Sequence, residues 1–259
     1  MKEFFEPALC AYVDVLGFRE KIQQAYSNGE QERLFESLSE IFGACGARMK
    51  EAGGRLPMLR VKSFSDNLIL AYSTDPFFGQ SLSHLCELLA DYQLKMACNH
   101  GLFLRGAISV GTIGISDNII FGDCLLKAHD LEKTSAKFPR IIVDSEIEKR
   151  VATKAARLET TWLLRDSDAH LFVNYLKALY QPKSAHQAMQ TLFVNEDQLS
   201  NHRKELEQHL DQERQRPDVW FKYFWVANYH NHFCEANGQQ KFKITESLLL
   251  SKPTELTTA

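Results

Sequence analysis

No stretch of this chain approaches the roughly 18 uninterrupted apolar residues that indicate a membrane-spanning helix. An excess of charge of one sign is also lacking, because 30 basic and 33 acidic side chains leave a formal net charge of −3. Without a basic surplus, electrostatics gives no reason to expect a long nucleic acid as partner. The N-terminal MKEFFEPALCAYVD places acidic residues and a proline before its apolar run, which argues against a secretory signal. We therefore expect a cytoplasmic protein with neither a membrane nor a nucleic-acid partner.

Several cofactor motifs are missing as well. The six cysteines show no C-x-x-C spacing, so neither a zinc site nor a disulfide framework is indicated, and their mostly apolar surroundings predict buried, reduced thiols. Gly106, Gly111 and Gly114 form no dinucleotide or P-loop pattern, and no G-x-S-x-G elbow occurs. The sequence therefore suggests no haem, flavin or zinc chemistry.

Hydrophobic periodicity predicts alternating strands and helices over the first part of the chain. The segment Ser65 to Asn67 lies between two β-prone runs and suits a tight hairpin. The whole order predicts an α/β sandwich with a mixed, mostly antiparallel sheet. Strands are expected at 8–15, 57–64, 67–73, 102–112, 119–121 and 141–144, and helices at 18–28, from 34 to 42 and on toward Gly53, at 76–99 and at 123–134.

The organisation changes beyond about residue 158. A hairpin is expected to turn at Asp166 to Ala169, followed by a largely helical tail over 185–236. In that tail a polar run with mixed charges predicts a solvated helix that ends at Pro217, and an aromatic-rich helix follows it. We expect three regions: a domain over 1–165, a hairpin and helical extension over 166–250, and a disordered end at 251–259.

Two aspartates are the most informative polar residues. Asp14 lies near the end of the apolar run ALCAYVDVLGF, and Asp66 lies between the two strands of the expected hairpin. Each has a simple structural explanation, because Asp14 is placed to cap the helix after Gly17 and Asp66 is a common turn residue. If the first strand lies beside the hairpin, however, both carboxylates reach the same edge of the sheet. Carboxylate pairs of this kind hold Mg²⁺ together with substrate phosphates.

Four segments, in this order and spacing, resemble the class III nucleotide cyclase domain, and the likeness is greatest to the bacterial pyrimidine cyclases of the Pycsar anti-phage system. The resemblance covers roughly residues 8–165 and implies a ferredoxin-like mixed sheet with helices. The segments are AYVDVLGF (11–18), LRVKSFSDNLIL (59–70), LRGAISVG (104–111) and IIFGDCLLKAHDLEK (119–133).

The resemblance implies a site shared by two subunits arranged head to tail. Asp14 and Asp66 match the aspartates that bridge two Mg²⁺ or Mn²⁺ ions, and the carbonyl of Val15 would complete a metal shell. The backbone amides of Leu16, Gly17 and Phe18 would hold the triphosphate, as the start of a helix can.

Three basic residues are further candidates. Lys62 stands where purine cyclases carry a base-reading side chain, although a solvated strand lysine explains it equally well. Arg105 interrupts an apolar strand, so we expect it to meet a carboxylate or a phosphate. The asparagine and arginine that purine cyclases place after the Phe-Gly turn are replaced here by Leu126 and Asp130, so Lys127 or Arg105 is a candidate substitute.

The purine-reading aspartate is also missing, with Ile119 nearest to its position. The resemblance thus implies a homodimeric uridylate cyclase that converts UTP to 3′,5′-cyclic UMP and pyrophosphate, with a product that acts on a separate effector protein after phage infection. Cyclic CMP synthesis from CTP is the nearest alternative. A catalytically silent nucleotide-binding module and a polymerase-like nucleotidyltransferase remain as rivals of other classes.

Overall fold

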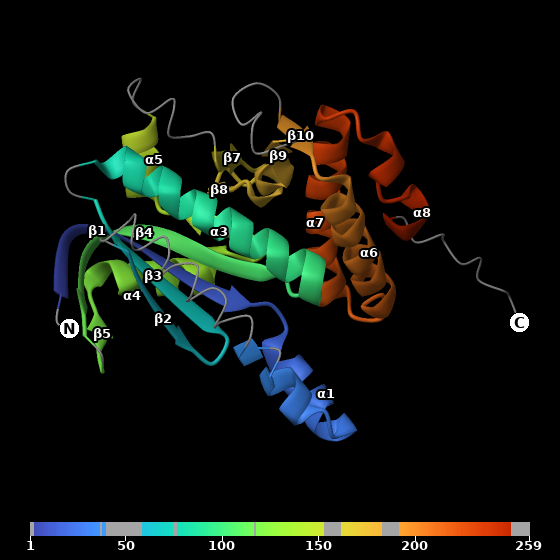
Figure 1. Cartoon of the computed structure of the whole chain (residues 1–259), viewed down its shortest axis with the longest axis horizontal. Coiled ribbons are helices and arrows are strands. Elements are labelled where there is room, and N and C mark those ends of the chain that lie inside the picture. The colour runs from blue at the N-terminus through green and yellow to red at the C-terminus, as the bar shows by residue number, and fades with distance from the viewer. Residues whose placement is uncertain are drawn as a thin grey trace, which may run out of the picture. The chain divides into compact units, whose positions relative to one another are not determined.

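The computed structural model describes residues 3–36, 38–39, 59–74, 77–116, 118–152, 162–182 and 192–249. The chain divides into two compact units (Figure 1). The first comprises residues 1–96 and 102–178, and the second comprises residues 97–101 and 179–259.

An eight-stranded sheet forms the centre of the first unit, in the order β2-β3-β1-β4-β6-β8-β7 with β5 paired to β4. The β4–β6 pair is parallel and the other pairs are antiparallel. The mixed, mostly antiparallel sheet predicted from the sequence is therefore confirmed. The strands are β1 (Glu3–Val15), β2 (Leu59–Phe64), β3 (Asn67–Ser73), β4 (Leu104–Ile115), β5 (Ile120–Phe121), β6 (Ile141–Val143), β7 (Leu163–Arg165) and β8 (Leu171–Val173).

Two long helices of this unit lie against the sheet. α3 (Phe78–His100) runs along the strands in Figure 1, and α4 (Asp123–Ser135) packs on β1 and β4. Because strand side chains alternate between faces, Cys10, Tyr12 and Asp14 share one face of β1. Contacts from Cys10 to Cys124 and from Tyr12 to His129 identify it as the face that α4 covers. This unit also contains α1 (Phe18–Asn28) and α5 (Ser145–Val151), and η3 (Tyr175–Leu179) lies at its end.

Most expected elements agree with the structure, with differences at their ends. The first strand begins at Glu3, and Asp144 caps α5 by accepting the Ile147 N–H at 2.8 Å, so it does not extend the preceding strand. The second expected helix is helical over 31–36 and 38–39, and its remainder lies outside the described residues. The hairpin at Asp166 to Ala169 forms as expected, but Phe172 pairs with Ile142 and joins this hairpin to the first unit's sheet.

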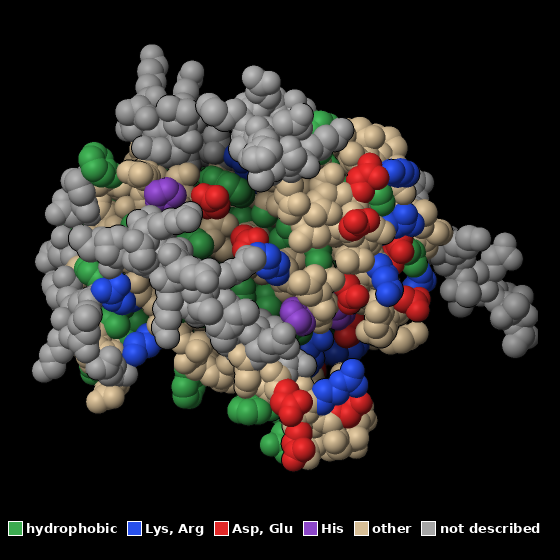
Figure 2. Space-filling model, viewed as in Figure 1, with side chains coloured by type: hydrophobic (Ala, Val, Ile, Leu, Met, Phe, Trp, Pro, Cys, Tyr) green, Lys and Arg blue, Asp and Glu red, His purple; other side chains and the backbone are tan. Residues whose placement is uncertain are grey.

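The second unit contains two long helices, α6 (Glu196–Gln212) and α7 (Pro217–Ala236), with η5 (Gln240–Phe242) and α8 (Glu246–Leu249) after them. α6 buries Leu199, His202, Leu206 and Leu210 along one side, so it is only partly a solvated helix. A two-stranded sheet of β9 (Tyr180–Pro182) and β10 (Leu192–Val194) was not predicted from the sequence, and β10 lies within the expected helical tail. Acidic and basic side chains are interspersed over α6 in Figure 2.

The cysteines of the described residues are buried within the fold. Cys10, Cys86, Cys98, Cys124 and Cys234 are buried free thiols, as predicted, whereas Cys45 lies outside the described residues. No helix in the described part of the chain is long and apolar enough to cross a membrane. The expected disordered segment 251–259 also lies outside the described residues.

Arg140 is fully buried and pairs with Asp166 and Asp168, with its guanidinium 5.3 Å from the centroid of the Phe138 ring. We predict that Arg140→Met lowers the free energy of unfolding by about 3 kcal/mol, because it leaves two carboxylates without their counter-charge. Urea denaturation measures this loss. Arg150→Met is the matched control, since its pair with Glu146 is exposed and worth less than about 1 kcal/mol. Equal losses in the two variants would contradict this view of Arg140.

Candidate metal and nucleotide site

The sheet register brings the two predicted aspartates to one edge. β1 pairs with β3 through Val13 and Leu68, so Asp14 is the next residue along β1 toward the hairpin turn. β2 and β3 pair up to Phe64 and Asn67, which leaves Ser65 and Asp66 as a two-residue turn. Ser65 has a φ of 56°, a value uncommon for a residue other than glycine. Asp66 is therefore both a turn residue and a neighbour of Asp14.

The Asp14 carboxylate does not cap the helix that follows it. α1 has Gly17 at its N-cap position and no side-chain cap hydrogen bond. Burial raises the pKa of Asp14 to about 7, and a hydrogen bond and charge repulsion from the Asp66 carboxylate add to the effect. The two carboxylates thus meet in space, which is the condition on which the sequence interpretation depended.

Arg105 lies directly opposite Asp14 in the β1–β4 pair. Its Nε and Nη2 atoms donate hydrogen bonds to Asp14 Oδ2 at 3.1 and 3.0 Å, and they moderate the rise in the pKa of Asp14. The next residue, Gly106, allows the strands to approach, because a Cβ there would collide with the Tyr12 carbonyl oxygen. The expectation that Arg105 meets a carboxylate is confirmed.

Glu132 lies at the same site and was not predicted from the sequence. Its Oε1 atom is 2.8 Å from Arg105 Nε, and its side chain is 7% exposed. One signal was available, since Cys124, Ala128 and Glu132 recur at intervals of four residues and so share one face of a helix. A carboxylate on the face that packs on the sheet requires a partner.

The carboxylate pair fits a divalent cation by its chemistry. Two acidic groups in contact resist simultaneous ionisation, and a cation between them would remove that repulsion. Among the described residues there is no group of three or more histidine, cysteine, aspartate or glutamate side chains that could hold a metal. Further ligands would have to be backbone carbonyls, water or substrate phosphates, as is usual for Mg²⁺.

The turn after β1 offers fewer backbone donors than the sequence indicates. The Leu16 N–H donates to the Phe103 carbonyl at 2.9 Å and continues the β1–β4 pairing, so it is not available to hold a phosphate. Gly17, with a φ of 72°, and Phe18 begin α1, and the first amides of a helix have no partner within the helix. The part of the predicted phosphate-binding turn that the structure leaves available is therefore Gly17 and Phe18.

Lys62 shares the face of the sheet on which Asp14 lies. Lys62 pairs with Ile69, and Ile69 pairs with Tyr12, so these three side chains are neighbours on that face. Burial is the largest cause of the raised pKa of Tyr12, and the carboxylates of Asp14, Glu132 and Asp66 raise it further. Tyr12 is thus a second residue of this site that the sequence reading missed.

Lys127 lies beside the middle of β4, away from Arg105. Its Nζ atom donates to the Val110 carbonyl at 3.2 Å and lies 2.8 Å from Asp123 Oδ2. Val110 is five residues from Arg105, a separation of roughly 17 Å along a strand. Within one chain, Lys127 therefore lies far from Asp14, and the structure does not bring it to the carboxylate pair.

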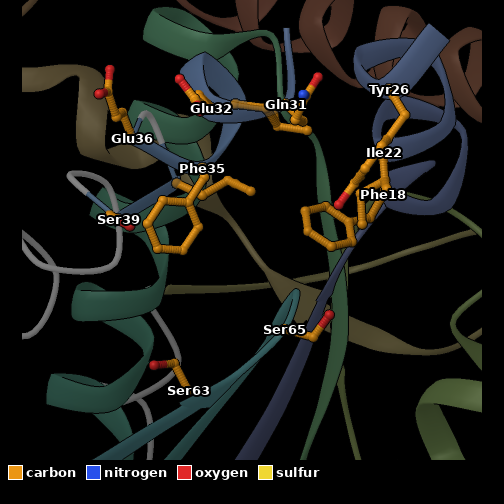
Figure 3. A pocket seen from close by; sticks show the side chains of 12 residues that line it. Phe18, Ile22, Tyr26, Gln31, Glu32, Phe35, Glu36, Ser39, Ser63 and Ser65 are labelled. Carbon is orange, nitrogen blue, oxygen red and sulfur yellow. The ribbon is translucent and has the colours of Figure 1, made fainter. Parts of the chain in front are cut away.

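A cavity of about 830 Å³ lies beside the hairpin turn, between α1 and the helical residues after it (Figure 3). Figure 3 shows the rings of Phe18 and Phe35 above Ser65. Ser63 also lines this cavity, whereas its neighbour Lys62 points from the opposite face of β2. The cavity therefore opens on the other side of the sheet from Lys62 and Tyr12.

The chain matches no family model and no curated protein sequence. Solved structures similar to it include nucleotide cyclase domains. The monomeric guanylyl cyclase domain of the RhoGC fusion protein from the aquatic fungus Blastocladiella emersonii shares 12% identity, covers 66% of this chain and 95% of its own, and has a TM-score of 0.49. The adenylyl cyclase CyaB from P. aeruginosa shares 13% identity, covers 67% and 95%, and has a TM-score of 0.46.

A third similar structure is the guanylate cyclase domain from Catenaria anguillulae in complex with GTP. It shares 11% identity, covers 66% of this chain and 95% of its own, and has a TM-score of 0.47. At such identities, the substrates of these proteins are properties of those proteins.

Proposed function

We propose that this protein is a metal-dependent nucleotidyl cyclase that converts UTP to 3′,5′-cyclic UMP and pyrophosphate. The observation that carries the proposal is the contact between the carboxylates of Asp14 and Asp66, in which burial and the neighbouring Asp66 raise the pKa of Asp14 to about 7. Such a pair is costly in a folded protein unless it binds a cation. The proposed reaction explains why the protein keeps two carboxylates in contact, because the reaction requires a cation at this position.

Asp14, Asp66 and the carbonyl of Val15 would hold two Mn²⁺ or Mg²⁺ ions, with the substrate phosphates as additional ligands. When bound, such ions make the ribose 3′-hydroxyl more acidic and neutralise charge on the departing pyrophosphate. The two aspartates act as ligands and transfer no proton themselves. In the metal-free protein, Arg105 orients Asp14 through two hydrogen bonds to Oδ2.

Other residues would bind the rest of the nucleotide. The amides of Gly17 and Phe18 begin an 11-residue helix, where a phosphate benefits from free N–H donors and from the helix dipole. Lys62 extends from the same face of the sheet as Asp14 and would contact the base. The purine-reading aspartate of the class is replaced, with Ile119 nearest, which favours a pyrimidine.

Two chains arranged head to tail would complete the site. Lys127 lies roughly 17 Å from the carboxylates along β4, so it would reach a nucleotide only from a second copy. Exposed apolar side chains support such an assembly, because Phe64 near the hairpin turn is 80% exposed and Phe121 and Leu126 near Lys127 are 58% and 66% exposed. A chain that turns over nucleotide while sedimenting as a monomer would contradict this arrangement.

The decisive experiment incubates the purified chain with each of the four nucleoside triphosphates and Mn²⁺, and separates the products by chromatography. We expect cyclic UMP and pyrophosphate from UTP. Cyclic CMP as the main product would select the CTP alternative, because uracil and cytosine differ by one donor or acceptor at the base edge. The product would then act on a separate effector protein, in keeping with the family resemblance.

Three other outcomes of this experiment would contradict the uridylate cyclase proposal. A purine product would exclude the pyrimidine assignment, and oligonucleotide products would indicate a polymerase-like nucleotidyltransferase. No cyclic product from any triphosphate would leave a nucleotide-binding module as the better account. The formal charge of −3 already makes the polymerase reading less attractive, since a polynucleotide product favours a basic surface.

A further inference from the structure

Glu132 has an unusual position for a charged residue. It lies on α4 among otherwise small buried side chains, and the whole residue is 6% exposed. Its Oε1 atom is buried and has no hydrogen-bond partner within the described part of the chain. Yet the Arg105 Nε atom lies only 2.8 Å away. A buried carboxylate oxygen this close to a guanidinium, and still without a hydrogen bond, requires an explanation.

Competition for one donor explains the orphaned oxygen. The Nε–H of Arg105 is directed at Asp14 Oδ2, which also accepts the Nη2–H. A single N–H cannot serve both carboxylates well, so Asp14 receives the hydrogen bond and Glu132 receives only the charge contact. Arg105 therefore lies between Asp14 Oδ2, which accepts its hydrogen bonds, and Glu132 Oε1, which accepts none.

We propose that Glu132 is a positioning residue that accepts Arg105 when Asp14 binds a divalent cation. This inference rests on the metal site of the proposed function. A cation at Asp14 would compete with the guanidinium for Oδ2, the oxygen that now accepts both hydrogen bonds from Arg105. Arg105 then needs another acceptor, and Glu132 Oε1 already lies within hydrogen-bond distance. A small rotation of the guanidinium would exchange one charge-assisted hydrogen bond for another, so the guanidinium would keep a carboxylate partner when the metal binds.

This exchange of acceptors predicts that the affinity for the metal depends on the charge of Glu132. Without the Glu132 charge, Arg105 remains on Asp14 and competes with the cation. Outer groups that orient metal ligands typically change affinity by about 10- to 100-fold when they are replaced. Glu132→Gln keeps the shape of the side chain and removes its charge, so we expect the Mn²⁺ dissociation constant to rise about tenfold or more.

A double variant separates this role from simple damage to the fold. Arg105→Leu combined with Glu132→Leu removes the competitor and its second acceptor together, and leaves no unpaired charge between them. We expect it to bind Mn²⁺ within about threefold of the unchanged protein, because Asp14 and Asp66 are then free of competition. Glu146→Gln is the matched control, since Glu146 also pairs with an arginine but is 49% exposed.

The experiment titrates the full chain and these three variants with Mn²⁺ alone, following free Mn²⁺ by electron paramagnetic resonance, with circular dichroism to verify folding. Weaker binding in Glu132→Gln, recovered in the double variant, is the expected result. Unchanged affinity in Glu132→Gln, or a double variant as weak as the single one, would overturn the proposal. Cyclic-product formation by the unchanged protein is measured separately. Its absence, with the expected Mn²⁺ pattern intact, would refute only the cyclase function, while a chain that binds no Mn²⁺ would refute both.

Discussion

Asp66→Asn is expected to lower nucleotide cyclisation by at least about 10³-fold, because it removes one of two anionic metal ligands and several kcal/mol of transition-state stabilisation. The substitution preserves the size of the side chain and its place in the hairpin turn, where asparagine is equally suitable. The loss therefore reports on charge and not on the turn. Initial rates with UTP and Mn²⁺, measured for the variant and the unchanged protein side by side, give the result.

Stability supplies the internal control for this variant. Asp66 raises the pKa of Asp14 through charge repulsion, so the metal-free fold is strained by the pair at neutral pH. Asp66→Asn should therefore melt at the same temperature or higher at pH 8, an inverse relation between activity and stability that marks a functional carboxylate. Asp91→Asn, which removes an exposed partner of Lys95 on α3, should retain full activity. An active Asp66→Asn protein would refute the metal assignment.

The sequence predicted that Asp14 and Asp66 meet if the first strand lies beside the hairpin, and the β1–β3 pairing meets that condition. A tight hairpin and an adjacent apolar strand leave few arrangements, and the pairing of Val13 with Leu68 is the expected one. Local chemistry was less predictable. The Leu16 amide was expected to hold phosphate, but it continues the pairing with β4 by one residue, a detail of strand ending that composition does not determine.

Contacts between segments that are distant in the sequence were the hardest to predict from the sequence. Glu132 is 118 positions from Asp14 in the sequence, and the Arg105 that connects them lies on a third element. Its helical spacing with Cys124 and Ala128 indicates a shared face, but only the structure shows that this face packs on β1 and β4. The role of Lys127 remains a prediction for the same reason, since it depends on a second chain.

The pH dependence of metal binding offers a test that needs no substrate. A proton and a cation compete for Asp14, so affinity falls once the pH drops below the pKa of the carboxyl group. Burial and the neighbouring Asp66 raise that pKa to about 7. From pH 8 to pH 5 the Mn²⁺ dissociation constant should therefore rise by nearly 100-fold, about tenfold for each pH unit below 7. An aspartate with an ordinary pKa near 3.9 would lose almost nothing over that range.

The metal-free protein should respond to pH in the opposite direction. Because the folded-state pKa of Asp14 lies above its unfolded value, the folded form holds a proton that the unfolded chain releases. This contribution to stability is fully present below about pH 4 and is lost as the pH rises through about 7. Asp66→Asn should reduce this loss, because the neutral amide no longer repels the Asp14 charge. Thermal melts at pH 5 and pH 8, with and without Mn²⁺, measure both effects, and equal Mn²⁺ affinity at the two pH values would show that Asp14 is ionised throughout and unperturbed by its neighbour.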